Sequence, residues 1–200
     1  PVSVLGEIAG ADGLDATAFG CLTQMVEFGR FDSHGLWRWM LYYLACNPGH
    51  ADELAGQDSA VERRSRAMMI VRETLRLQQS EAILRYVTRP FVYGGFYFPR
   101  RARLRFCIWE AHKDERNFAA PFDFRPDRFN SGAPPADAYA PLGIDHHKCL
   151  GASWTYELAA IFTEVLCSTC RFTLERNTPV AMGHFHFEPG AHTTVRFAPR

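Results

Sequence analysis

The stretch Leu142-Gly143-Ile144-Asp145-His146-His147-Lys148-Cys149-Leu150-Gly151 carries the most information about the fold. Glycines lie on both sides of the cysteine, the titratable His147 precedes it by two residues, and a long amphipathic run follows at once. This order predicts a thiolate in a tight loop at the start of a helix, where the helix dipole and free backbone N–H groups stabilise the anion. A fixed thiolate of this kind is what an axial haem ligand requires, whereas the alternative is a small buried hydrophobic cysteine.

Length and composition predict one domain, or part of a larger one, within residues 1–200. The 22 Lys and Arg residues balance the 22 Asp and Glu residues, which argues against nucleic-acid binding and against a polybasic membrane patch. Six cysteines with no secretory signal favour reduced thiols and a cytoplasmic setting. The longest apolar run, Met40–Cys46, is far too short to cross a membrane.

Hydrophobic spacing changes along the chain from helical to alternating and predicts a mainly α protein with small β-sheets. A helix over 14–46 with Asp15 as N-cap ends at Asn47-Pro48-Gly49, and Gly94-Gly95 predicts a hairpin turn. The other expected elements are a short helix over 50–55, a helix over 60–79, strands within 82–109, a meander with the cysteine loop over 118–151, a last helix over 152–170 and terminal strands within 184–197.

Four motifs occur in a specific order along these elements. Glu73-x-x-Arg76 lies on a helix, Arg85 lies in a strand, Phe124-Arg125-Pro126-Asp127-Arg128-Phe129 lies in the meander, and the Cys149 loop follows. In this order the chain, from about Thr23 to its C-terminus, resembles the C-terminal haem-binding half of the cytochrome P450 fold. The cofactor implied is haem b (heme b, iron protoporphyrin IX).

The resemblance implies a role for each motif. Glu73, Arg76 and Arg128 would form a buried charge triad that pins the meander beneath the haem, rather than an exposed helix pair. Cys149 would be the proximal iron ligand. His147 and Arg85 would hold the haem propionates, with a surface strand arginine as the alternative for Arg85. Gly143, Gly151 and Gly29 are further candidates for the haem-binding set.

The distal side of the site falls on Gly29-Arg30-Phe31-Asp32-Ser33 of the long helix. Gly29 would let a ligand approach the helix closely. Asp32 and Ser33 stand where the family carries an acid and an alcohol, and would relay protons during catalysis. The alternative is a solvated Asp beside a Ser that caps its own helix turn.

Several positions depart from the family pattern. Arg30 and Asp145 stand where glycine is usual, Leu142 stands for phenylalanine, and Thr155 stands for a small residue. Arg30 is expected to point away from the haem or to pair with Glu27. Asp145 predicts an unusual geometry for the cysteine loop. The family fold is about twice as long, so the missing N-terminal half is an expected partner of apolar surface on the long helix and the sheet.

Three functions stay open. The first is a monooxygenase that takes electrons from a ferredoxin or a flavoprotein reductase and oxidises a small apolar organic substrate. The second is a peroxygenase or hydroperoxide isomerase, in which Arg30 would anchor a substrate carboxylate. The third is a truncated fragment without stable haem. A rival metal site at Cys167-x-x-Cys170 with His146 or His184, or at His184 and His186, is less favoured than core packing and a solvated or pocket-facing strand.

Overall fold

The computed structural model describes residues 15–78, 82–135, 137–182 and 186–200, and of Ala18, Phe28 and Phe31 the backbone alone. Residue 14, Gln79, His184 and Phe185, at the edges of expected elements, lie outside the described residues. The described part is mainly helical with small antiparallel sheets, as the sequence predicted.

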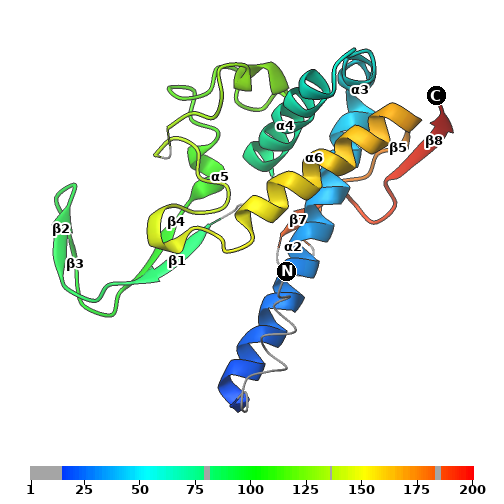
Figure 1. Ribbon diagram of the computed structural model, residues 1–200. Coiled ribbons are helices and arrows are strands. Elements are labelled where there is room, and N and C mark those ends of the chain that lie inside the picture. Colours follow the sequence, from blue (N-terminus) through cyan, green and yellow to red (C-terminus); the bar gives the residue numbers. More distant parts are fainter. Residues whose placement is uncertain (1–14, 79–81, 136, 183–185) are drawn as a thin grey trace.

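Four helices form the body of the molecule (Figure 1). The long helix α2 spans Ala16–Cys46 without a break at its glycines. Helix α3 spans Pro48–Ala55 and begins two residues before the expected start, because proline fits the first turn of a helix. Helix α4 spans Ala60–Leu77 and begins with a capping box between Ser59 and Glu62. Helix α6 spans Ala152–Thr169.

Within the described residues the strands pair in four small antiparallel sheets. The pairs are β1 (Ile83–Tyr86) with β4 (Arg103–Phe106), β2 (Phe91–Tyr93) with β3 (Phe96–Phe98), β5 (Cys170–Arg176) with β8 (Thr194–Pro199), and β6 (Ala181–Met182) with β7 (Phe187–Glu188). Gly94 and Gly95 join β2 to β3 with φ of 57° and 83°, a conformation that favours glycine, and this confirms the predicted hairpin turn.

Three expectations about the elements were wrong in detail. Residues Ile108–Ala111 form a helical turn, α5, instead of continuing a strand to Trp109. The last helix ends at Thr169, and the next residues form strand β5, whose buried Phe172 packs against the core. His186 lies in a bend just before β7 and not within a strand.

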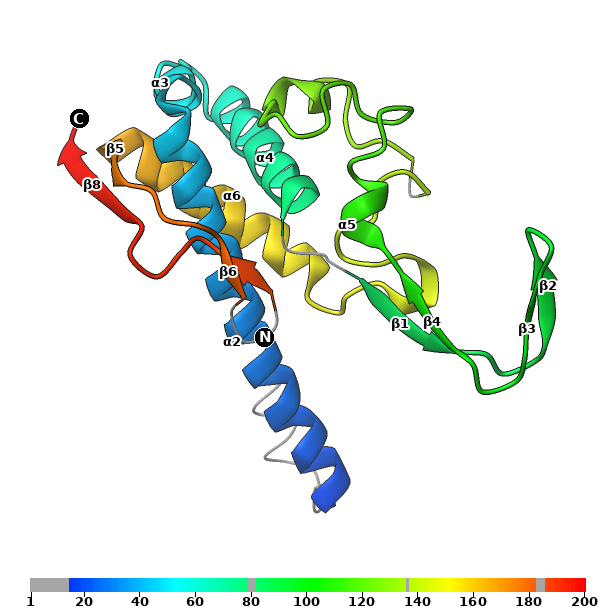
Figure 2. The ribbon, with the colours of Figure 1, turned by 180° about the vertical axis from the view of Figure 1, so that it is seen from behind.

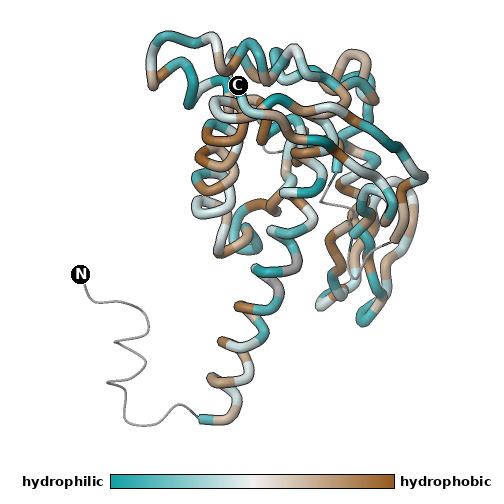
Figure 3. The backbone as a smooth tube through the Cα atoms, turned by 90° about the vertical axis from the view of Figure 1, so that its right-hand side faces the viewer, coloured by the Kyte–Doolittle hydropathy of each residue, from teal (hydrophilic) through white to brown (hydrophobic). Residues whose placement is uncertain are grey.

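The main core lies between α2, α4, α6 and β5. Met40 and Leu44 of α2 and Ile70 and Leu75 of α4 are fully buried. Ala159 on α6 is also fully buried and presents little side chain to its neighbours. The N-terminal half of α2 and the β2–β3 hairpin extend away from this body (Figures 2 and 3).

Candidate active site

The carboxylate of Glu73 on α4 is fully buried and joins α4 to the meander. Its Oε2 accepts from Arg76 Nε at 2.7 Å. Its Oε1 accepts from Arg76 Nη2 at 2.9 Å, from Arg128 Nε at 3.0 Å and from the Arg125 backbone N–H at 2.8 Å. The structure therefore brings Glu73, Arg76 and Arg128 together below α4.

Arg76 is fully buried as well, and all five of its guanidinium N–H groups have acceptors. Three bonds go to backbone oxygens: Nη1 donates to His112 at 2.8 Å and to Pro121 at 2.7 Å, and Nη2 donates to Asp123 at 3.2 Å. A buried ion pair is tolerated only when its remaining polar atoms are satisfied, and this pair meets that condition.

Arg128 links parts of the meander to one another, and Arg66 attaches the meander to α3 and α4. Arg128 Nη1 and Nη2 donate to the carbonyls of Ala119 and Ala120 at 2.9 and 3.2 Å. Arg66 of α4 pairs with Asp127 in the short 3-10 helix η1 (Pro126–Phe129) and with Glu53 of α3. The meander is thus held through charged groups, although it contains little regular secondary structure.

His112 carries this network toward the cysteine loop. Its Nε2 accepts from the Ala140 backbone N–H at 3.1 Å, so the neutral ring holds its proton on Nδ1. The preceding residue, Tyr139, stacks on His112 and donates to the Arg72 carbonyl of α4 at 2.9 Å. Burial, with Lys113 and Arg76 nearby, lowers the pKa of His112 to about 3.

Lys113 closes the C-terminal end of α4. Its Nζ donates to the carbonyls of Arg76 and Leu77 at 3.1 and 3.0 Å and lies 4.4 Å from the centre of the Trp109 ring. Burial lowers the pKa of Lys113 to about 7. Sequence reasoning missed both His112 and Lys113, and the signal that could have found them was two adjacent titratable residues between the predicted strands and the meander.

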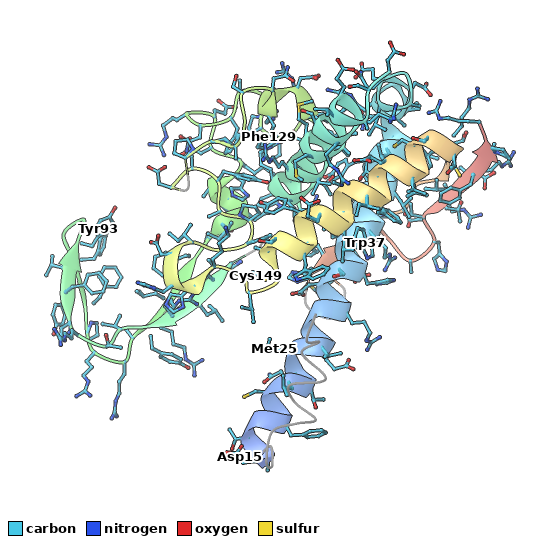
Figure 4. All side chains as sticks on the ribbon, viewed as in Figure 1. Asp15, Met25, Trp37, Tyr93, Phe129 and Cys149 are labelled. Carbon is cyan, nitrogen blue, oxygen red and sulfur yellow. The ribbon has the colours of Figure 1, made fainter. Side chains whose placement is uncertain are left out.

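Backbone hydrogen bonds close the cysteine loop, and Figure 4 labels Cys149 in it. The Cys149 N–H donates to the Leu142 carbonyl at 2.7 Å, and the Cys149 carbonyl accepts from the N–H of Ala152, the first residue of α6, at 3.1 Å. Cys149 itself is exposed and its thiol is free. It lies just before the N-cap, Gly151, of α6.

Two residues adopt left-handed backbone conformations in this loop. Gly143 has φ of 77°, and a Cβ there would lie 2.6 Å from the His147 carbonyl oxygen, so only glycine fits. Asp145 has φ of 49°, the conformation in which the usual glycine is free of strain and which aspartate tolerates better than most residues. At Gly151 a Cβ would meet only ordinary contacts, the nearest being Cys149 Sγ at 3.9 Å.

The residues around Cys149 fit a planar apolar group that carries carboxylates. Ile144 and Leu150, both within the cysteine loop, leave 41% and 81% of their surface exposed. His147 ends the short 3-10 helix η2 (Asp145–His147) and is exposed, and Arg85 is half-buried on β1. Among the described residues neither side chain contacts a carboxylate; Arg85 Nη1 donates only to the Leu84 carbonyl at 2.7 Å. An open thiol, exposed apolar side chains and two side chains that can donate hydrogen bonds to carboxylates are the donor set that a haem with propionates requires.

The distal segment of α2 holds a contact that the sequence did not indicate. His186 Nε2 lies 2.9 Å from Asp32 Oδ1, which joins the β6–β7 segment to the helix. The Ser33 hydroxyl bonds to none of the described residues, so within this part of the chain it does not cap its own helix turn. A Cβ at Gly29 would meet nothing within 4 Å.

Arg30, another departure from the family pattern, forms an exposed ion pair. Arg30 Nη2 donates to Glu27 Oε2 at 2.8 Å and the two side chains are 63% and 51% exposed, which is the expected pairing.

At the rival metal site Cys167 is fully buried, and burial raises the pKa of its thiol to about 12. The described residues contain no group of three or more His, Cys, Asp or Glu side chains placed to hold a metal ion.

Comparison with known proteins agrees with this geometry. The family model described as Cytochrome P450 matches residues 35–182. The chain is 28% identical over 148 residues to Cytochrome P450 714B1 of Oryza sativa subsp. japonica (64% of this chain, 28% of the relative). It is 27% identical to 3,9-dihydroxypterocarpan 6A-monooxygenase of Glycine max and 26% identical to Putative cytochrome P450 137 of Mycobacterium tuberculosis, covering 62% and 65% of this chain. Those matches cover 27% and 28% of the two relatives' lengths, so the chain is similar to only a part of each relative.

A cysteine loop that leads directly into α6, together with a buried Glu73–Arg76–Arg128 network, is the arrangement that a haem-thiolate protein requires. The chain belongs to the cytochrome P450 family, which implies a haem cofactor. No helix of the described residues is both long and apolar enough to cross a membrane.

The depressed pKa of His112 predicts loss of stability in mild acid. The unfolded residue titrates near 6.5 and the folded one near 3, so below pH 6.5 the unfolded chain binds a proton that the folded chain does not. Above pH 6.5, His112 therefore has little effect on how the free energy of unfolding varies with pH. At about pH 5, protonation of His112 in the unfolded chain lowers the free energy of unfolding by about 2 kcal/mol. His112→Gln keeps an acceptor for the Ala140 N–H and does not titrate, so urea unfolding at about pH 7.5 and pH 5 should show a smaller loss than in the parent.

The exposed His192 supplies the control for this measurement. His192→Gln should retain the parental pH dependence. An equal loss of stability in the parent and in His112→Gln would show that His112 is not held neutral by the fold.

Proposed function

We propose that the protein is a haem-thiolate monooxygenase that oxidises a small apolar organic substrate with electrons from a ferredoxin or a flavoprotein reductase. The observation that carries the proposal is the free, exposed thiol of Cys149 in a loop anchored to the buried Glu73–Arg76 pair through His112 and Ala140. The family membership and relatives named as a monooxygenase and a hydroxylase support the same activity.

Each residue of the loop would have a defined task. Cys149 Sγ would bind the iron of haem b, and His147 and Arg85 would donate to its propionates. Gly143 keeps the loop closed, because any larger residue would collide with the His147 carbonyl. When bound, the haem supplies the site at which dioxygen is activated, and the negative thiolate favours cleavage of the O–O bond.

Asp32 and Ser33 would handle the protons. The Ser33 hydroxyl is half-buried and Asp32 precedes it on α2. The contact of Asp32 Oδ1 with His186 Nε2 would hold the Asp32 carboxyl group in place while it gives up a proton. An acid and a hydroxyl in this order form a short path for protons along the helix surface.

The peroxide-using alternative is less well supported. It needs Arg30 as an anchor for a substrate carboxylate, but the Arg30 guanidinium is bonded to Glu27 one turn away. The third possibility is a fragment without stable haem, which would not retain the cofactor. The spectrum of the reduced carbon monoxide complex, which tests thiolate ligation, also tests this possibility.

Exposed apolar stripes suggest how the rest of a longer protein would pack here. Along α6, large apolar side chains recur every three or four positions and are 44–72% exposed: Trp154, Leu158, Ile161 and Val165. On α2 the corresponding set is Phe19, Met25 and Val26. These two faces would be covered by the missing half of the fold, since the matches cover little more than a quarter of most relatives.

The spectrum of the reduced carbon monoxide complex tests the thiolate. Purified protein with haem should show the strongly red-shifted Soret band of thiolate ligation, and Cys149→Ser should lose that band while Cys107→Ser keeps it, because Cys107 is also an exposed free thiol. A red-shifted band that persists in Cys149→Ser would assign the ligand elsewhere, and a parent that retains no haem would favour the fragment.

Product formed per electron consumed tests the proton path. Ser33→Ala should bind haem and substrate normally but divert electrons to hydrogen peroxide, because a positioned proton donor contributes about 10²–10⁴-fold in rate. The rate with supplied peroxide should change much less, since that oxygen already bears protons. Unchanged coupling in Ser33→Ala would count against the monooxygenase and favour the peroxide-using alternative.

A further inference from the structure

The zero net charge of the chain conceals a strongly basic segment. Residues 82–107 contain six arginines and no aspartate or glutamate. This local excess corrects the expectation, based on the overall charge balance, that the chain has no basic patch. The segment comprises strands β1 to β4, and it is the part that projects furthest to one side of the body (Figures 1 and 2).

The four strands form one bent ribbon. β1–β4 and β2–β3 share a single register, in which Tyr86 pairs with Arg103 and Phe91 pairs with Phe98. Between them Val87 N–H donates to the Ala102 carbonyl at 2.9 Å, and Arg101 adopts φ of 70°. A left-handed residue bends a ribbon locally, so the β2–β3 hairpin is directed away from the body and ends near Tyr93 (Figure 4).

The tip of the hairpin is aromatic and uncharged. From Pro90 to Pro99 no side chain carries a charge. The register places four aromatic rings on one face: Phe91, Tyr93, Phe96 and Phe98. Tyr93 and Phe96, beside the glycine turn, are 76% and 73% exposed, and Tyr97 on the opposite face is 65% exposed.

Arginines surround the base of this tip. Five of them are exposed and contact no carboxylate among the described residues: Arg89, Arg100, Arg101, Arg103 and Arg105. Continuing the register places Arg89 opposite Arg100, immediately behind the two prolines that bound the aromatic segment. Arg85, which is half-buried and assigned to the haem, is not counted here.

We propose that the β2–β3 hairpin is a peripheral anchor for a bilayer with anionic headgroups. Its aromatic tip would enter the interfacial layer, and the five exposed arginines would bind the headgroups. Amphipathic side chains favour that layer, and the surface potential of anionic lipids attracts clustered cations. Strands of this length reach about 10 Å, which matches the depth to which interfacial segments are buried.

The arrangement favours a bilayer over a nucleic acid. In the hairpin the apolar and cationic groups are separated into layers, with the rings beyond the arginines, as a lipid interface is layered. Single-stranded nucleic acids are bound instead by grooves in which cations follow the backbone while aromatic residues stack on successive bases. The proposal does not depend on haem binding or on the proposed activity.

Vesicle sedimentation with the 200-residue chain tests the anchor. The parent should bind vesicles of phosphatidylcholine with about 30% phosphatidylserine more tightly than phosphatidylcholine alone, and added salt should weaken the binding. The charge variant R89Q/R100Q should bind the anionic vesicles about 25-fold more weakly, from about 5-fold for each arginine. The tip variant Y93S/F96S should bind at least 10-fold more weakly, because the apolar anchor is lost.

Matched variants elsewhere on the surface serve as controls. R171Q/R176Q removes two exposed arginines of β5, and F19S/V61S removes two exposed apolar side chains, and both should bind like the parent. The proposal is overturned if the parent does not prefer anionic vesicles, or if the hairpin variants bind as it does. It is also overturned if the tip variant keeps vesicle binding while an oligonucleotide displaces the parent, which would assign the hairpin to nucleic acid.

Discussion

One buried carboxylate group, that of Glu73, holds the meander against α4. It accepts hydrogen bonds from two guanidinium groups and from the backbone of a third residue, Arg125, and no part of it reaches solvent. Removing one partner of such a buried pair costs about 3–5 kcal/mol, because the remaining charge is left without compensation. The meander has almost no regular secondary structure, so these charged contacts supply the order that a helix or sheet would otherwise supply.

The same network reaches the cysteine loop through short steps. Arg76 holds the His112 carbonyl, the His112 ring holds the Ala140 N–H, and the Leu142 carbonyl two residues further on holds the Cys149 N–H. The thiol is therefore exposed on a loop whose supports are buried. A metal ligand needs this combination of free access for the ligating atom and fixed backbone around it.

Sequence reasoning recovers contacts that are local or that belong to an ordered motif. Glu73 and Arg76 are three residues apart on one helix face, and their pairing follows from that spacing alone. By contrast, the contact of Asp32 with His186 joins residues 154 positions apart, and no periodicity points to it. Strand β5 was missed because the amphipathic run of α6 leads into it without a break, and the charge balance of the whole chain hid the basic hairpin. Asp145, where the family pattern has glycine, adopts φ of 49°, a backbone conformation that glycine takes up without strain.

Hydrogen exchange of the Arg76→Lys variant is the decisive measurement of whether the Glu73 network supports the cysteine loop. Lysine keeps a positive charge beside Glu73 but lacks the guanidinium fork that bonds the carbonyls of His112, Pro121 and Asp123. If the loop depends on this network, exchange should be faster across 118–129 and also at the amides of Ala140 and Cys149, with α2 unchanged, whereas Arg116→Lys at an exposed ion pair should alter neither. Faster exchange that stops before Ala140 would mean that the cysteine loop is held independently of the buried carboxylate.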